Sequence, residues 1–287
     1  MAAITAKMVA DLRTQTGCGM MDCKKALAES NGDFDGAVKF LREKGLAVAA
    51  KKADRIAAEG VVDILVSEDG KTAAMIEVNA ETDFVAKNEK FLDFVKGLLK
   101  TIIATKPADV AELLTKNFDG TDMSVEAKLK DMIFTIGENM NIRRFEIVEG
   151  ITSTYIHGGG MAGVIVKFDT TEEIAAKDGF AEFAKNICLQ IAANAPKYIN
   201  PEDVPQEEID AELEIKLNAL KEQKGKLPPE QALVGIKNGM AAKYCTQICL
   251  TKQDYVADGD LTVEKYLEGD ASFAPKKPDM SDMPFEV

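Results

Sequence analysis

Two segments of the chain are similar to each other at a constant offset of 89 residues. The matching positions are Gly70, Ile76, Phe91, Phe94 and Lys96 in the first segment and Gly159, Ile165, Phe180, Phe183 and Lys185 in the second. Each segment has two runs typical of strands, at 61–66 and 73–78 and again at 153–155 and 163–168. A run with helical spacing follows each pair, over 89–104 and over 180–193. The repeat therefore predicts two related strand-strand-helix units in an α+β fold.

The first 45 residues have the pattern of three short helices. One face of the first helix carries Ile4, Met8, Val9 and Leu12. The chain then breaks at 17–19, a second helix covers 21–28, and Asp33 is placed to cap a third helix that stops at Gly45. An Ala- and Lys-rich stretch over 46–58 predicts a helical linker. A bundle of this size buries little surface, so we expect contacts outside the bundle to contribute to its stability.

Beyond the second repeat, the pattern predicts a helical hairpin. Its first arm has a narrow apolar stripe made by Ile209, Leu213, Leu217 and Leu220. This stripe predicts packing against the other arm, a neighbouring subunit or a partner. The predicted domain organisation is a three-helix module with its linker at 1–55, core subdomains at 56–145 and at 146–198 with 251–268, an inserted hairpin at 199–250 and a flexible tail at 269–287.

Charge and composition exclude several classes of function. The 287 residues carry a net charge of −13, whereas nonspecific nucleic-acid binding needs clustered Lys and Arg. Residues 1–55 instead carry a net positive charge, with ten Lys and Arg against seven Asp and Glu. This charge indicates either an acidic partner or an ordinary solvated surface. No apolar run is long enough for a membrane span, and the N-terminus lacks the pattern of a signal or transit peptide. We therefore expect a cytoplasmic protein.

Five cysteines and a single histidine offer little for metal or redox chemistry. No two cysteines form a CxxC pair, so reduced structural thiols are the simplest interpretation. One histidine with scattered cysteines does not make a tetrahedral metal site. We expect no metal and no cofactor.

The glycine-rich run at 158–163 matches two motifs, and its context fits neither. It satisfies GxGxxG, but the dinucleotide motif opens a helix, whereas this run leads into the strand predicted at 164–168. His157 and the three following glycines resemble an esterase oxyanion loop, yet no GxSxG-like elbow supplies a nucleophile. An esterase is a minor alternative. The preferred interpretation is a glycine-rich turn that exposes His157 for contact.

The segment EVNAETDFVAK at 77–87 carries the clearest functional signal. A strand runs into a connection where Asp83 and Phe84 stand side by side before a helix. One interpretation makes Phe84 a core residue and Asp83 a helix cap, and the repeat argues against it. The equivalent residues of the second copy are Thr171-Glu172-Glu173, although its core phenylalanines persist. Because an unpaired buried carboxylate is strongly disfavoured, Phe84 is predicted to lie on the surface of the first unit only.

Three stretches resemble the signatures of one family. They are LRTQTGCGMMDCKKAL at 12–27, EVNAETDFVAK at 77–87 and GENMNIRR at 137–144. On these residues the chain, from 1 to about 268, resembles the elongation factor Ts family, the nucleotide exchange factors of elongation factor Tu. The resemblance implies a ubiquitin-associated-like N-terminal module, a core of two subdomains and an inserted helical hairpin. Members typically end with a further strand and a C-terminal helical module, which we cannot place on this sequence.

The resemblance also implies a function and the residues that carry it. The chain would bind the GDP complex of elongation factor Tu, disturb its magnesium site and promote GDP release so that GTP can bind. The residues implied at the magnesium site are Thr82, Asp83, Phe84 and Val85. Further contacts are implied for Arg13, Met20 and Met21 of the N-terminal module and for His157 and Gly158 of the second core subdomain.

The main alternative is a ubiquitin-associated-type adaptor, in which residues 1–45 bind another protein and the core is a scaffold. It fits the N-terminal helices but gives Asp83 and Phe84 no role. The preferred interpretation is a binding protein that is not an enzyme, with no direct nucleic-acid or membrane contact. A homodimer and a heterotetramer with the partner are both compatible with the sequence, which leaves the oligomeric state open.

Overall fold

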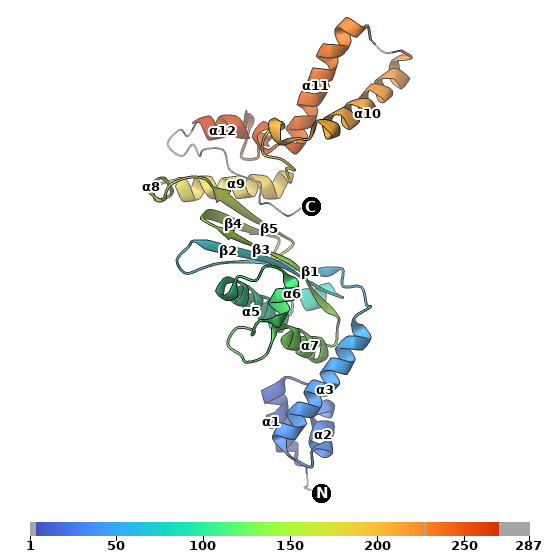
Figure 1. The fold of residues 1–287 in the computed structure, drawn as a ribbon, viewed down its shortest axis with the longest axis vertical. Helices are drawn as coiled ribbons and strands as arrows, with labels where there is room; N and C mark the ends of the chain where they lie inside the picture. Colours follow the sequence, from blue (N-terminus) through green and yellow to red (C-terminus); the bar gives the residue numbers. More distant parts are fainter. Residues whose placement is uncertain (1–3, 227, 270–287) are drawn as a thin grey trace. The chain divides into compact units, whose positions relative to one another are not determined.

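The computed structural model describes residues 4–226 and 228–269, in which groups of helices and groups of strands follow one another along the chain (Figure 1). This part forms two compact units. The first runs to Ile147 and includes Ile156–Gly163, and the second holds Val148–Tyr155 and the residues from Val164 onward. Among the residues described, no helix combines the length and apolar character needed to span a bilayer. Apart from Gly269, the tail predicted at 269–287 lies outside them, and the five-part domain organisation stays a prediction.

The first three helices form the predicted N-terminal bundle, with bounds α1 (Ala6–Thr16), α2 (Met20–Glu29) and α3 (Phe34–Lys52). Polar side chains begin two of them. Oγ1 of Thr5 accepts the N–H of Met8, and the carboxylate of Asp33 accepts the N–H of Gly36. Gly17 ends α1 in the left-handed region, with φ of 69°. The buried core of the bundle consists of Val9, Leu12, Cys18, Cys23, Ala26, Leu27, Ala37 and Leu41.

The third helix does not stop at Gly45, as the sequence predicted, but continues to Lys52. Gly45 is buried, and a β-carbon there would lie 3.4 Å from the β-carbon of Phe134 in α7 (Val125–Ile136). The glycine therefore allows a close approach between α3 and α7 instead of ending the helix. As a result, α3 itself attaches the bundle to the rest of the first unit.

Three strands form the sheet of the first unit in the order β1-β2-β3. Their bounds are β1 (Glu59–Val66), β2 (Thr72–Ala80) and β3 (Met140–Glu149). β1 and β2 are antiparallel with Glu59 opposite Ala80, which confirms the predicted hairpin. Gly70 has a φ of 70° in the connecting turn, a conformation that glycine adopts without strain. Glu59 and Ala80 therefore mark the end of the sheet from which the chain enters α4 (Asp83–Ala86).

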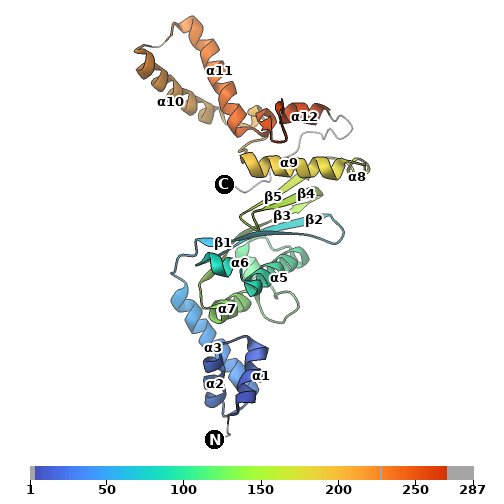
Figure 2. The same ribbon diagram turned by 180° about the vertical axis from the view of Figure 1, so that it is seen from behind.

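Four helices accompany this sheet, and α5, α6 and α7 lie on one of its faces in both views (Figures 1 and 2). Besides α7, they are α4 (Asp83–Ala86), α5 (Glu89–Thr105) and α6 (Val110–Thr115). The helix predicted at 89–104 is α5, whose Phe91, Phe94 and Leu98 are buried in one apolar cluster with Ile76 and Val78 of β2. Burial of each such side chain stabilises the fold by about 1.5–3 kcal/mol. The sequence patterns did not predict α6 or α7.

The second unit contains the second strand-strand-helix segment and a short C-terminal part. Its elements include most of β4 (Ile151–His157) and of β5 (Ala162–Phe168), with α8 (Glu172–Ala175), α9 (Phe180–Asn194), β6 (Asp254–Tyr255), β7 (Asp258–Thr262) and α12 (Val263–Gly269). β4 pairs with β5, and β6 pairs with β7. Phe168, Phe180 and Phe183 are buried in its core, with 5.4 Å between the ring centroids of Phe168 and Phe180. The phenylalanines of the repeat are therefore core residues in both copies.

The predicted helical hairpin is formed by α10 (Gln206–Lys224) and α11 (Glu230–Ile248), which contact each other (Figure 1). At its base, the carboxylate of Glu208 accepts hydrogen bonds from the hydroxyl groups of Tyr198 at 2.8 Å and Tyr244 at 2.5 Å. This acceptor fixes the start of α10 to the end of α11. Ile209, the first residue of the apolar stripe, packs against a cluster that contains Cys245 and Ile248 of α11.

The two copies of the repeat share local geometry as well as sequence. Thr82 precedes α4 and Thr171 precedes α8, and each hydroxyl accepts the backbone N–H of the third residue on. The residues that cap the C-terminal ends of α5 and α9 are Lys106 and Ala195, which have φ values of 43° and 39°. A non-glycine residue in this left-handed region is uncommon. The same cap at equivalent positions therefore supports the predicted repeat.

Candidate functional site

Thr82, Asp83, Phe84 and Val85 lie in a single helical turn directly after β2, and we call residues 82–87 the α4 turn. Adjacent side chains of this turn have opposite environments. Val85 is 6% exposed and packs in the main apolar cluster of the first unit, whereas Phe84 is 82% exposed. The predicted surface position of Phe84 is confirmed. An exposed aromatic ring on an anchored turn is well suited to contact another protein.

Asp83 forms an ion pair within the same turn. Its Oδ2 atom accepts a hydrogen bond from Nζ of Lys87 at 2.7 Å, and both side chains are exposed. This hydrogen bond and the charge of Lys87 lower the pKa of Asp83, and the same contact raises the pKa of Lys87. Asp83 is therefore ionised at neutral pH. Because exposed ion pairs contribute little stability, the carboxylate can exchange Lys87 for another partner at small cost.

Four residues, which we call the brace, hold the start of the α4 turn: Glu81, Thr82, Glu138 and Asn139. The carboxylate of Glu138 accepts the backbone N–H of Thr82 at 3.1 Å and the hydroxyl of Thr82 at 3.0 Å. In the opposite sense, the carboxylate of Glu81 accepts the backbone N–H of Asn139 at 2.6 Å. Hydrogen bonds to a charged acceptor are strong. The brace therefore ties the end of β2 to the start of β3.

The brace also reaches the segment that follows α3. The side-chain amide of Asn139 donates to the backbone carbonyls of Ala53 at 3.3 Å and Arg55 at 2.8 Å. Arg55 in turn forms an ion pair with Glu81 at 3.5 Å. The same brace residues therefore hold both the segment that follows α3 and the start of the α4 turn. Sequence reasoning gave Glu138 and Asn139 no role, although the stretch GENMNIRR contains both.

Residues from two of the family-like stretches also meet in the sheet. Glu77 of β2 pairs with Arg143 at 2.9 Å and with Arg144 at 2.7 Å, both on β3. Burial opposes the ionised form of Glu77, but its hydrogen bonds and charge interactions with the two arginines outweigh burial and lower its pKa. These ion pairs hold β3 beside β2, a few residues before the α4 turn.

In the second unit, the equivalent turn is capped by a threonine in the same way, but its exposed side chains differ. Glu172 and Glu173 take the places of Asp83 and Phe84, and both are exposed. A carboxylate at the position of Phe84 is therefore compatible with the local structure. The aromatic ring is not required by the turn, which leaves it available for a role outside the fold.

The three residues expected to make contacts in the N-terminal bundle lie next to the loop between α1 and α2. Arg13 is in the last turn of α1, and Met20 and Met21 begin α2. All three side chains are exposed, Met20 by 54% and Met21 by 75%. Flexible thioethers adapt to apolar grooves. Their surface position is compatible with docking, and their role stays a prediction.

The glycine-rich loop at Ile156–Gly163 belongs to the first unit. His157 is exposed at its start, and Gly158 follows with a φ of 59°. The carbonyl of Gly160 accepts the N–H of Val62 at 2.8 Å, so the loop is fixed on β1. The glycines lead into β5 and not into a helix, as the sequence predicted. The loop therefore lacks the helix N-terminus on which dinucleotide binding depends, and its role as a contact stays a prediction.

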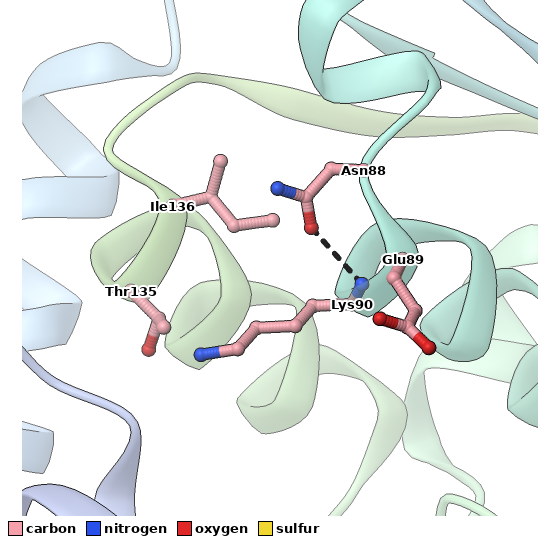
Figure 3. Close-up of a pocket in the computed structure, with 5 residues that line it drawn as sticks. All are labelled: Asn88, Glu89, Lys90, Thr135 and Ile136. Carbon is pink, nitrogen blue, oxygen red and sulfur yellow. Dashed lines mark hydrogen bonds between the residues drawn. The ribbon is translucent and has the colours of Figure 1, made fainter.

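A depression of about 420 Å³ lies beside the α4 turn and is lined by Asn88, Glu89, Lys90, Thr135 and Ile136 (Figure 3). Oδ1 of Asn88 accepts the backbone N–H of Lys90 at 2.9 Å and so caps α5. The ammonium group of Lys90 extends toward Thr135 (Figure 3). Across the described part of the chain, no three His, Cys, Asp or Glu side chains are grouped to hold a metal ion. We assign no chemistry to this depression.

Comparison with known proteins agrees with the resemblance drawn from the sequence. A family model described as Elongation factor TS matches residues 81–277, which include the α4 turn and the brace. Elongation factor Ts of Clostridium perfringens (strain SM101 / Type A) is 46% identical over 269 residues, covering 92% of this chain and 86% of that protein. The same factor of Syntrophotalea carbinolica is 45% identical with equal coverage, and that of Clostridium kluyveri is 46% identical over 270 residues, covering 92% and 86%. The chain therefore belongs to the elongation factor Ts family.

Proposed function

We propose that this chain is a guanine nucleotide exchange factor that binds the GDP complex of elongation factor Tu and promotes GDP release. Family membership supports the class of activity. The observation that carries the proposal at the level of residues is the contrast within the α4 turn. Phe84 is exposed while Val85 beside it is anchored in the core, so the ring is held in place and remains free to enter another protein.

The α4 turn acts as a wedge in this proposal. Covering the ring of Phe84 makes about 1.5–3 kcal/mol of binding free energy available. Asp83 brings an ionised carboxylate next to that ring. Inserted near the magnesium site of the GTPase, the two side chains displace the groups that hold the ion. Magnesium neutralises the nucleotide phosphates, so disturbing it weakens GDP binding, by about tenfold for each 1.4 kcal/mol lost.

Exchange of this kind requires no covalent step. A factor that prefers the nucleotide-free partner must weaken nucleotide binding to the same extent, because coupling between two ligands is reciprocal. This chain then needs no general base, no metal and no cofactor of its own. Its partner is a translation factor, and the proposed place of action is the cytoplasm.

The other predicted contacts extend the interface without taking part in the wedge. Met20 and Met21 offer flexible apolar side chains beside Arg13, and the loop at His157 and Gly158 offers a second surface fixed on β1. Replacing both methionines with alanine is expected to weaken binding to elongation factor Tu without abolishing it. Complete loss of complex formation would instead favour the adaptor alternative. Mass measurement of the chain with and without its partner would distinguish a homodimer from a heterotetramer.

The direct test measures release of fluorescent GDP from purified elongation factor Tu by stopped-flow fluorescence. The wild-type chain is expected to accelerate release, and the Asp83→Ala/Phe84→Ala double variant is expected to lose most of this effect. Glu173→Ala, which changes the equivalent turn of the second unit, serves as the matched control and should retain full activity. Absence of acceleration by the wild-type chain would refute the function. An active double variant would refute the wedge mechanism alone.

A further inference from the structure

We infer that Glu138 is a positioning residue for nucleotide exchange, which acts by fixing the direction in which the α4 turn presents Phe84. This inference rests on the proposed function, because it concerns the efficiency of that exchange. Glu138 lies just before β3, 56 residues from Thr82 in sequence, and its carboxylate contacts the α4 turn at Thr82.

The α4 turn cannot hold itself in place. It contains only the four helical residues Asp83–Ala86, and so short a helix is unstable without outside contacts. Thr82 is its N-cap, in an extended conformation with φ of −131° and ψ of 156°. The hydroxyl of Thr82 accepts the N–H of Val85 inside the turn, while its own proton remains for an external acceptor.

Glu138 supplies that acceptor. One carboxylate takes two hydrogen bonds from Thr82, the backbone N–H at 3.1 Å and the hydroxyl at 3.0 Å. Fixing both groups of one residue sets the orientation of the peptide plane from which the turn begins. Val85 fixes the other side of the turn through apolar packing. Phe84 lies between these two attachments, so its direction depends on both.

The reciprocal half of the brace makes Glu138 itself rigid. The neighbouring Asn139 is held through its N–H by Glu81, and its side chain is held by the carbonyls of Ala53 and Arg55. When a rate depends on the precise placement of a side chain, a displacement of about 1 Å can lower that rate strongly. The geometry therefore assigns to Glu138 an effect on exchange that passes through Phe84.

A double-mutant cycle tests this route. The proteins compared are the full-length wild type, Glu138→Gln, Phe84→Ala and the variant with both changes, with Glu68→Gln as a charge-matched control in the exposed turn between β1 and β2. Each is assayed for release of fluorescent GDP from elongation factor Tu and for its thermal unfolding midpoint. Glu138→Gln is expected to slow exchange about tenfold in the wild-type background and less than about twofold in the Phe84→Ala background. Any change of the midpoint should be equal in both backgrounds, and Glu68→Gln should leave both measurements unchanged.

The possible outcomes separate this inference from the proposed function. If Phe84→Ala alone leaves exchange intact, the wedge mechanism fails and the positioning role with it. If Phe84→Ala slows exchange but Glu138→Gln does not, only the positioning role fails. An equal loss on changing Glu138 in both backgrounds would mean direct contact with the partner or general damage, and would also overturn it.

A second pair of variants covers the case in which Glu138→Gln does not fold. Thr82→Ser keeps the hydroxyl that donates to Glu138, so its exchange rate is expected to exceed that of Thr82→Val. Thr82→Val keeps the shape of the side chain but removes that hydroxyl, and is expected to slow exchange in the manner of Glu138→Gln. Equal rates for these two variants would overturn the inference.

Discussion

Phe84 and Val85 are neighbours in one helical turn, and truncation to alanine is expected to affect them in opposite ways. Val85 is 6% exposed, so Val85→Ala removes two buried methyl groups, each worth about 0.8 kcal/mol, and leaves a small cavity. The expected loss of unfolding free energy is about 2 kcal/mol. Phe84 is 82% exposed, and Phe84→Ala should change the unfolding free energy by no more than about 0.5 kcal/mol.

The effects on exchange are expected in the reverse order. If the partner covers the exposed 82% of the Phe84 side chain, truncation removes about 1.2–2.5 kcal/mol of binding, which is about seven- to sixtyfold in exchange efficiency. Val85 is buried in this chain and anchors the wedge instead of entering the partner, so Val85→Ala should keep most of its exchange activity at temperatures where the variant is folded. Its loss of about 2 kcal/mol corresponds to a fall of about 4–8 °C in unfolding midpoint for a unit of this size.

Two measurements on the same preparations check this pair of variants. Far-ultraviolet circular dichroism follows thermal unfolding, because the chain has no tryptophan for intrinsic fluorescence. Release of fluorescent GDP from elongation factor Tu gives the exchange efficiency. A midpoint for Phe84→Ala as low as that of Val85→Ala would make the ring a structural residue. Unchanged exchange by a stable Phe84→Ala variant would refute the reasoning that leads from its exposure to its role.

Three further predictions follow from contacts outside the α4 turn. The pKa of Glu77 is lower in the folded chain than its ordinary value of 4.5, so its stabilising contribution is complete above about pH 4.5 and is lost as the pH falls through the folded-state value. Urea unfolding should therefore show a gap between wild type and Glu77→Gln at neutral pH that closes in acid, and a gap independent of pH would contradict this. Gly97→Ala should destabilise the chain by about 1–3 kcal/mol, since the added β-carbon would overlap Cζ of Phe118; a calorimetric midpoint equal to that of the wild type would count against this packing. The hydrogen bond to Glu208 raises the pKa of Tyr244 to about 12, and in Glu208→Gln ultraviolet titration should find that tyrosine nearer its ordinary value of 10, whereas an unmoved titration would argue against the contact.

Much of the local structure could be predicted because it depends on residues that are close in sequence. The apolar spacing of 89–104 predicted α5 to within a residue of its observed end at Thr105. The strands and turn of the first hairpin were predicted from alternating apolar runs around Gly70. Exposure of Phe84 was predicted because the repeat provides an internal control, in which Glu173 occupies the same position.

The errors and omissions concern positions whose role depends on distant residues. Gly45 was predicted to end a helix, but its lack of a side chain serves the contact with Phe134 of α7. Glu138 and Asn139 had no predicted role, because their partners Thr82 and Ala53 lie 56 and 86 residues away. Local patterns cannot distinguish a glycine that ends a helix from one that permits close packing.

By itself, the sequence determined the repeat, the order of its strands and helices, the family resemblance and the residues of the α4 turn. These follow from periodicity, turn chemistry and comparison between two copies, all of which act over short distances along the chain. The tertiary structure alone decided how the turn is held, through Glu138, Asn139 and the packing of Val85. Such contacts exist only after folding brings remote segments together, because hydrogen-bond donors and acceptors pair by distance in space and leave no periodic signal in the sequence.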